Sequence, residues 1–303
     1  MRNSFINELL NQAKYNKKIF LITADIGFSV IEPFANKYPK RFLNAGISEQ
    51  NMVLAAAGLA SEGYNVFIYS IGNFPILRCL EQIRNYVCYS SANVKIISTG
   101  AGYAYGPLGV SHHTTEDISI LRSLPNIQII SPSDPLESKA AAAYLSKMSG
   151  PAYLRLSKSG DPIIHQKKIS FKNKNPFCIK RQPNSNIAIL VTGNILKRVI
   201  EESCEYKNVD IFSFPFIKPI PKKIVIDIYQ KYKYIITVEE HQLAGGFSSS
   251  LLEIYNDENI YSMKKNKIFR IGIKDKFCSY AGSQDYLIKK NNLSVKNVLK
   301  LLV

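Results

Sequence analysis

The stretch "RFLNAGISEQNMVLAAAGLASEGYNVFIYS" (residues 41–70) has the pattern of a helix followed by a buried strand, which is the repeating unit of the predicted fold. After a glycine turn, an apolar run with helical character leads to Gly63, a residue type favoured just after a helix. The segment "NVFIYS" (residues 65–70) follows and is typical of a short buried strand. A helix followed by a buried strand favours a parallel sheet covered by helices.

The same alternation continues along the chain in both directions. Strand patterns occur at residues 19–27, 93–99, 127–134, 151–157, 186–193, 208–214, 234–240 and 268–273, with helical patterns between them. One of these helices is predicted to begin after an N-cap at Asp134. Residues 161–185 break the rhythm because they are polar, basic and dotted with proline. We therefore predict two three-layer α/β/α domains, residues 1–160 and 186–303, joined by a linker at residues 161–185.

Composition limits the class of protein. The chain has 303 residues, 46% of them hydrophobic, without a signal-peptide pattern or an apolar run near the roughly 20 residues that span a bilayer. A soluble cytoplasmic protein without a membrane partner is expected. Five cysteines without a CxxC pair predict reduced thiols. The net charge of +16 lies in short clusters, which favours a solvated surface or anionic substrates over nucleic acid.

The loop "GAGYAYGPLG" (residues 100–109) does not have the G-x-G-x-x-G spacing of a dinucleotide fingerprint. It is more typical of a mobile loop over a ligand, since glycines permit close backbone approach. The adjacent His112 and His113 are a poor metal site, because neighbouring side chains diverge and no third ligand stands at a suitable spacing, so no metal site is predicted. Either one histidine is structural and the other exposed, or the loop presents a histidine that donates hydrogen bonds near neutral pH.

Glu49 has two interpretations. Ser48 can cap the helix that follows, and an acid in the first turn is stabilised by the helix dipole by roughly 0.3–1 kcal/mol. That account is sufficient by itself. The alternative is a carboxylate that takes part in catalysis, and residues elsewhere in the chain decide between these two interpretations.

Colinear motifs along nearly the whole chain resemble the pyrimidine-binding and C-terminal domains of the transketolase family, which are thiamine-diphosphate enzymes. They are "ADIG" (24–27), "NAGISEQNM" (44–52), "FPILRCLEQIRN" (74–85), "GPLGVSHHTTEDISILRSLPN" (106–126), "SPSDPLE" (131–137), "GPAYLRLSKSG" (150–160), "TVEEHQLAGGFSSSLLE" (237–253) and "GSQDYL" (282–287). The chain is similar to the smaller subunit of a split transketolase.

The resemblance implies roles in holding thiamine diphosphate. Glu49 matches the glutamate that hydrogen-bonds the aminopyrimidine and thereby promotes formation of the cofactor's carbon nucleophile. Phe74 matches the aromatic ring that stacks on the pyrimidine, although a core phenylalanine is its plain alternative. Asp25 and Ile26 match the acidic and apolar pair beside the thiazolium.

The resemblance also implies a substrate site. His112 matches a histidine that contacts the oxygen on the substrate's reacting carbon, so Glu49 and His112 are the expected catalytic residues. Arg2, Ser29 and Lys158 match positions that hold a sugar phosphate. At Lys158 the family commonly has arginine, and lysine keeps the charge but loses the bidentate fork.

Two positions depart from transketolases that use ordinary ketose phosphates. Leu108 stands where an acidic residue reads a donor hydroxyl, and Gly100 stands where a second histidine contacts phosphate. We therefore expect a transfer of a two-carbon ketol unit between unusual sugars, such as in the making of a modified or branched sugar.

The family's metal motif, "GDG" with a downstream asparagine, does not occur in this sequence; the nearest stretch is "SGDP" (159–162). The resemblance therefore implies that Mg²⁺ (or Ca²⁺) and the diphosphate are held by an α subunit in an α2β2 assembly. The alternatives are the β subunit of a 2-oxoacid dehydrogenase, which shares the fold and the glutamate, and a non-catalytic relative.

Overall fold

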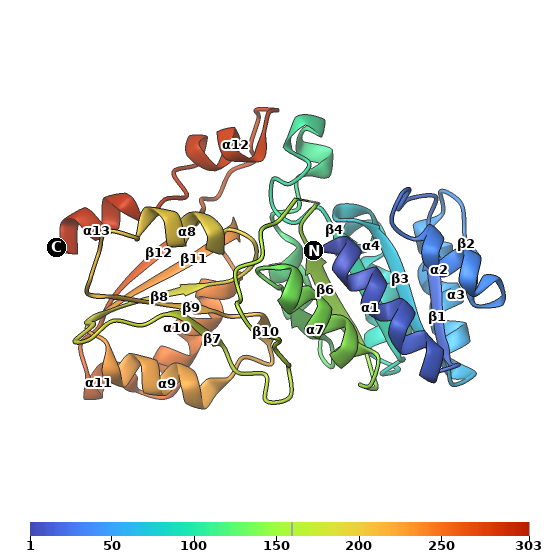
Figure 1. Cartoon of the computed structure of the whole chain (residues 1–303), viewed down its shortest axis with the longest axis horizontal. Coiled ribbons are helices and arrows are strands. Elements are labelled where there is room, and N and C mark those ends of the chain that lie inside the picture. The colour runs from blue at the N-terminus through green and yellow to red at the C-terminus, as the bar shows by residue number, and fades with distance from the viewer. Residues whose placement is uncertain (159, 303) are drawn as a thin grey trace.

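The computed structural model describes residues 1–158 and 160–302, which form two sheets with helices on both faces. Figure 1 shows the two units side by side, with the N-terminus close to the boundary between them. The predicted pair of α/β/α domains is confirmed in this architecture. Within the described residues, no helix combines the length and apolarity that a membrane crossing requires.

The first sheet has seven strands in the order β10-β5-β6-β4-β3-β1-β2. All neighbours are parallel except β10 and β5. The strands are β1 (Ile19–Thr23), β2 (Phe42–Asn44), β3 (Asn65–Ile71), β4 (Val94–Thr99), β5 (Gln128–Ile130), β6 (Ala152–Leu156) and β10 (Phe216–Lys218). The helices are α1 (Arg2–Tyr15), α2 (Glu32–Lys37), α3 (Glu49–Ser61), α4 (Asn73–Leu77), α5 (Leu80–Gln82), α6 (Asp117–Arg122) and α7 (Pro135–Leu145), with the short 3-10 helices η1 (Pro39–Arg41), η3 (Gly106–Leu108) and η4 (Val110–His112) and the π-helix η2 (Ile83–Cys88).

Helices cover both faces of the first sheet, and successive residues of each strand point to opposite faces. Its strands therefore bury side chains on both sides of the sheet. Leu21 of β1 belongs to the apolar cluster that contains Phe5 of α1. The next residue, Ile22, belongs to the opposite cluster, together with Met52 of α3. The continuous apolar pattern of these strands follows from this two-sided burial.

The second sheet has the order β12-β11-β8-β9-β7, and only β7 is antiparallel to its neighbour among the described strands. Its strands are β7 (Phe177–Lys180), β8 (Ile187–Val191), β9 (Val209–Ser213), β11 (Tyr234–Gln242) and β12 (Lys267–Ile273). Its helices are α8 (Leu196–Glu202), α9 (Lys222–Lys231), α10 (Phe247–Asp257), α11 (Ile260–Met263), α12 (Gln284–Lys290) and α13 (Lys296–Leu302).

Two short strands depart from the predicted division of the chain. β7 comes from the segment interpreted as a linker and joins the edge of the second sheet beside β9. β10 comes from the second half of the chain but pairs with β5 in the first sheet, where Phe216 is opposite Ile130. Phe216 is buried in the apolar cluster of the first domain, so this exchange adds core contacts across the boundary.

The two predicted helix caps have different outcomes. Asp134 caps α7 as predicted, since its Oδ1 accepts a hydrogen bond of 2.8 Å from the backbone N–H of Glu137. The prediction for Ser48 was wrong: its hydroxyl donates to the carbonyl of Ala45 at 2.6 Å and caps no helical N–H. The Ser48 side chain therefore stabilises the turn before α3 and not the first turn of the helix.

A buried carboxylate on α7 joins three segments of the chain. Glu137 Oε1 accepts a hydrogen bond of 2.6 Å from the Ser213 hydroxyl, and His165 Nε2 lies 2.9 Å from the same oxygen. Burial disfavours the charged imidazole, but the hydrogen bond and charge of Glu137 outweigh it and raise the pKa of His165. Charged His165 therefore stabilises the folded state.

This pair predicts a pH-dependent stability. Because the folded-state pKa of His165 is raised, its contribution is fully present below the unfolded pKa of about 6.5 and disappears as the pH rises through the folded value. The variant His165→Gln should therefore lose about 1–2 kcal/mol more unfolding free energy at about pH 6 than at about pH 9. Urea unfolding of both proteins at both pH values measures this, and an equal loss at both would contradict it.

Candidate functional site

The site residues predicted from the sequence gather at one edge of the first sheet. Asp25, Ile26 and Ser29 follow β1, Glu49 follows β2, Phe74 follows β3, His112 follows β4 and Lys158 follows β6. These five strands are consecutive neighbours in the sheet and run parallel. Ligands of α/β sheets bind outside the carboxyl ends of the strands, which is where these loops lie.

Glu49 is the first residue of α3 and its side chain is only 3% exposed. Its carboxylate accepts a hydrogen bond of 2.7 Å from Arg78, whose own side chain is 51% exposed. The sequence did not single out Arg78, although it lies within the quoted "FPILRCLEQIRN" stretch. A buried carboxylate whose one side-chain partner is half-exposed is arranged to exchange that partner for a ligand.

Phe74 and His112 complete a contiguous group around this pair. The ring centroids of Phe74 and His112 are 5.3 Å apart in an edge-to-face arrangement. The guanidinium carbon of Arg78 lies 5.3 Å from the Phe74 centroid, so contacts run from Glu49 through Arg78 and Phe74 to His112. Burial, and secondarily the neighbouring His113, lowers the pKa of His112. The imidazole is therefore neutral near pH 7 and able to act as donor or acceptor.

The loop after β1 is held in an unusual backbone conformation. Asp25 and Ser29 have positive φ values of 51° and 64°, which non-glycine residues seldom adopt. The N–H of Asp25 donates to Asn44 Oδ1 at 2.9 Å, and the N–H of Ser29 donates to Glu32 Oε1 at 2.7 Å. These bonds fix the loop and leave Asp25 exposed and Ile26 half-buried at the mouth of the site.

Arg2 and Lys158 lie near two tyrosines that the sequence did not single out. Among the described residues, Arg2 Nε and the buried Tyr69 hydroxyl form no regular hydrogen bond. Burial raises the pKa of Tyr69 to about 12, and the nearby Arg2 opposes this rise. Lys158 Nζ lies 5.5 Å from the ring centroid of Tyr105. Within the described chain, Ser29 forms no hydrogen bond or ion pair with Arg2 or Lys158.

The two histidines differ in their surroundings. His113 is buried, its Nε2 lies 3.3 Å from the carbonyl of Gly106, and its ring packs edge-to-face on Tyr103. His112 is the half-exposed one, beside Phe74. In the part of the chain that the structure describes, no three His, Cys, Asp or Glu side chains gather as metal ligands. His113 therefore supports the loop, while His112 faces the site.

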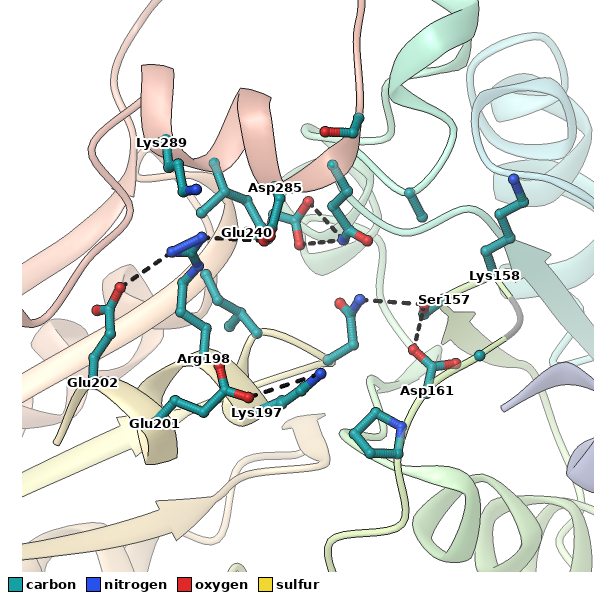
Figure 2. A pocket seen from close by; sticks show the side chains of 18 of the residues that line it. Ser157, Lys158, Asp161, Lys197, Arg198, Glu201, Glu202, Glu240, Asp285 and Lys289 are labelled. Atoms are coloured by element: carbon teal, nitrogen blue, oxygen red, sulfur yellow. Dashed lines mark hydrogen bonds and ion pairs between the residues drawn. The ribbon is translucent and has the colours of Figure 1, made fainter. Parts of the chain in front are cut away.

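A separate cleft of about 650 Å³ lies between the loop after β6, α8 and α12 (Figure 2). Some of its charged side chains pair with one another: Arg198 bonds Glu202 at 3.2 Å and Asp285 at 3.1 Å. Burial raises the pKa of Glu240, at its inner end, to about 7. Of the predicted site residues, the cleft is lined only by Lys158 in the described chain, so the chemistry is better placed at the sheet edge.

The architecture defines an α/β protein with a buried carboxylate, an aromatic ring and a neutral histidine at the ligand-binding edge of its first sheet. Residues 1–160 match the transketolase pyrimidine binding domain and residues 178–298 match the transketolase C-terminal domain. The chain belongs to the transketolase family. Membership implies a transferase that depends on thiamine diphosphate.

Similar proteins share nearly the whole length of the chain. A putative transketolase C-terminal section from Methanocaldococcus jannaschii is 31% identical, covering 100% of this chain and 95% of that protein. One subunit of an apulose-4-phosphate transketolase from Actinobacillus succinogenes is 28% identical over 99% of this chain and 96% of its own. A solved split gene transketolase, described as an inactive beta4 tetramer, is 29% identical with a TM-score of 0.86 over 99% of this chain and 95% of that one.

Proposed function

We propose that this chain is the β subunit of a thiamine-diphosphate-dependent transketolase that transfers a two-carbon ketol unit between sugars or sugar phosphates. The observation that carries the proposal is the buried Glu49 at the start of α3, in contact through Arg78 with the Phe74 and His112 pair. This group lies at the ligand-binding edge of a domain that matches the pyrimidine-binding family model.

The residues present fit the pyrimidine half of the cofactor. When bound, thiamine diphosphate supplies a carbon nucleophile and an electron sink for the ketol group. Glu49 holds the proton directed at the ring nitrogen of the aminopyrimidine, which requires Arg78 to leave the carboxylate. Phe74 offers its ring for stacking, and Asp25 and Ile26 border the thiazolium from the loop after β1.

A second group of residues at the same site holds the substrate. His112, neutral near pH 7, exchanges a hydrogen bond with the oxygen on the reacting carbon. Arg2 and Lys158 supply positive charge for a phosphate, with Ser29 on the neighbouring loop. Gly100 and Leu108 replace two polar side chains of ordinary transketolases, which favours a modified or branched sugar. Relatives named for apulose 4-phosphate support an unusual substrate.

A partner subunit is needed to cover the site. Apolar side chains stand exposed around it, including Phe28 at 73%, Ile47 at 80%, and also Leu77 and Val110. An apolar collar of this kind is typical of a protein interface. The sequence contains no "GDG" motif, and relatives of similar length are named as one subunit of a transketolase and as a C-terminal section. We assign Mg²⁺ and the diphosphate to an α subunit in an α2β2 assembly. For this chain we propose a pyrimidine-binding domain at residues 1–160, a linker at 161–185 and a C-terminal domain at 186–303.

Reconstitution tests this function. The purified chain alone should show no ketol transfer with thiamine diphosphate, Mg²⁺ and sugar phosphates, whereas adding a partner with the GDG domain should produce transfer. The α partner alone and the mixture without cofactor are the controls. Full-rate transfer by this chain alone would refute the need for a partner. Release of carbon dioxide from pyruvate would instead favour a 2-oxoacid dehydrogenase subunit.

A further inference from the structure

We propose that Tyr105 determines substrate specificity: its ring fills the space above Gly100 and forms an apolar wall that favours a deoxy or branched sugar. This inference rests on the proposed function and names the substrate class of the same site. The wall lies in the loop between β4 and η4, which leads directly to His112.

The first argument is steric. Gly100 has a φ of +96°, a conformation that other residues seldom adopt. A Cβ added at this position would lie 2.3 Å from Cδ2 and 2.6 Å from Cε2 of Tyr105. These distances are far below van der Waals contact, so position 100 can carry no side chain while the ring stays in place. The two positions are therefore coupled: Tyr105 occupies the space that a side chain at 100 would use.

The second argument is the position of the ring among the charged groups. Lys158 Nζ lies 5.5 Å from the Tyr105 centroid, within range of a cation–π contact. Tyr105 also adds to the rise in the pKa of Tyr69, whose hydroxyl lies near Arg2. The ring thus lies beside Lys158, a cation that suits an anionic group, and it is only partly buried.

The third argument is chemical. Leu108, three residues further along the same loop, is 55% exposed and has no hydrogen-bonding group. An aromatic face and an aliphatic side chain accept C–H and methyl groups but leave a sugar hydroxyl without a partner. An apolar pocket lowers kcat/KM for a substrate with an added hydroxyl by about 10²-fold at most. A site whose polar groups bind that hydroxyl discriminates far more strongly, in the opposite sense, against the deoxy analogue. The expected substrate is therefore a phosphorylated sugar that lacks a hydroxyl, or carries a carbon branch, at the position next to this wall.

The test uses the complex reconstituted with the GDG partner, thiamine diphosphate and Mg²⁺. The quantity measured is the ratio of kcat/KM for a deoxy ketose phosphate to that for its hydroxylated parent. The wild-type ratio should be about 10–100. Tyr105→Gln, which places a hydrogen-bonding group in the wall, should bring it to within about 3-fold of unity, and Tyr105→Phe should retain it. The matched control Tyr86→Gln, at an exposed tyrosine on η2, should leave it unchanged.

A ratio that is the same in Tyr105→Gln and in the wild type would overturn the role of Tyr105 while leaving ketol transfer intact. A wild-type complex that transfers from neither substrate would instead overturn the proposed function together with this inference. A wild-type ratio well below one would also contradict the apolar wall.

Melting temperatures supply a readout that needs no partner. Gly100→Ala should melt about 5–10 °C below the wild type, through strain at positive φ and the clash with the ring. The double variant Gly100→Ala/Tyr105→Leu should recover part of that loss, because the clash is removed and the strain remains. If the two substitutions lower the melting temperature additively, the coupling between the positions is disproved.

Discussion

Replacing Glu49 with alanine should lower the kcat of ketol transfer by the reconstituted complex by about 10²–10⁴-fold. The carboxylate is buried and points into the site, where its proposed role is to hold the proton directed at the cofactor's ring nitrogen. Glu49→Gln keeps the shape of the side chain but removes the acid, so it should lose nearly as much activity. Steady-state rates at saturating cofactor measure both effects.

The fold should tolerate these changes, which makes the loss of activity interpretable. Arg78, left without its partner, is half-exposed and stays hydrated, so no unpaired charge becomes buried. Glu62, an exposed glutamate just after the other end of α3, provides the matched control, and Glu62→Ala should change kcat by less than about 2-fold. Unchanged activity in Glu49→Ala would return Glu49 to the role of a first-turn acid and favour a non-catalytic relative.

The sequence predicts the sheets well because the information for them is local. A parallel strand buried on both faces needs a continuous apolar run, and β3 and β8 have one. The cap at Asp134 is equally local, since the acceptor and the N–H it satisfies are three residues apart. Ser48 has the same local signature, but its hydroxyl finds a nearer acceptor at Ala45.

Features that depend on distant parts of the chain could not be predicted in the same way. β10 has three residues and joins the first sheet beside β5, more than 80 positions earlier, so its pairing leaves no periodic pattern. Arg78 meets Glu49 because the loops after β2 and β3 converge at one edge, 29 residues apart in the chain. The placement of Tyr105 on Gly100 is short-range, yet it depends on a turn geometry that spacing alone does not specify.

The other large expected effect is a loss of stability on breaking the buried ion pair between Asp117 and Arg155. Asp117 at the start of α6 accepts hydrogen bonds from Arg155 Nε at 2.7 Å and from the Tyr153 hydroxyl at 2.6 Å. The Arg155 guanidinium, 2% exposed, also donates to the carbonyls of Thr114 at 2.7 Å and Glu240 at 3.1 Å. One arginine therefore connects β6, the segment after His112 and the end of β11 in the second domain.

Asp117→Asn should lower the free energy of unfolding by about 3–5 kcal/mol, because it leaves the guanidinium of Arg155 buried without its counter-charge. Urea unfolding measures this. Glu253, which pairs with Arg122 across the same domain boundary, is 56% exposed, so Glu253→Gln should cost less than about 1 kcal/mol. The double variant Asp117→Leu/Arg155→Leu should be less destabilised than Asp117→Asn, since no buried charge remains. If Asp117→Asn instead lowers the free energy of unfolding no more than Glu253→Gln does, the Arg155 guanidinium must be stabilised by water or another anion. The connection between the domains would then not depend on the Asp117–Arg155 pair.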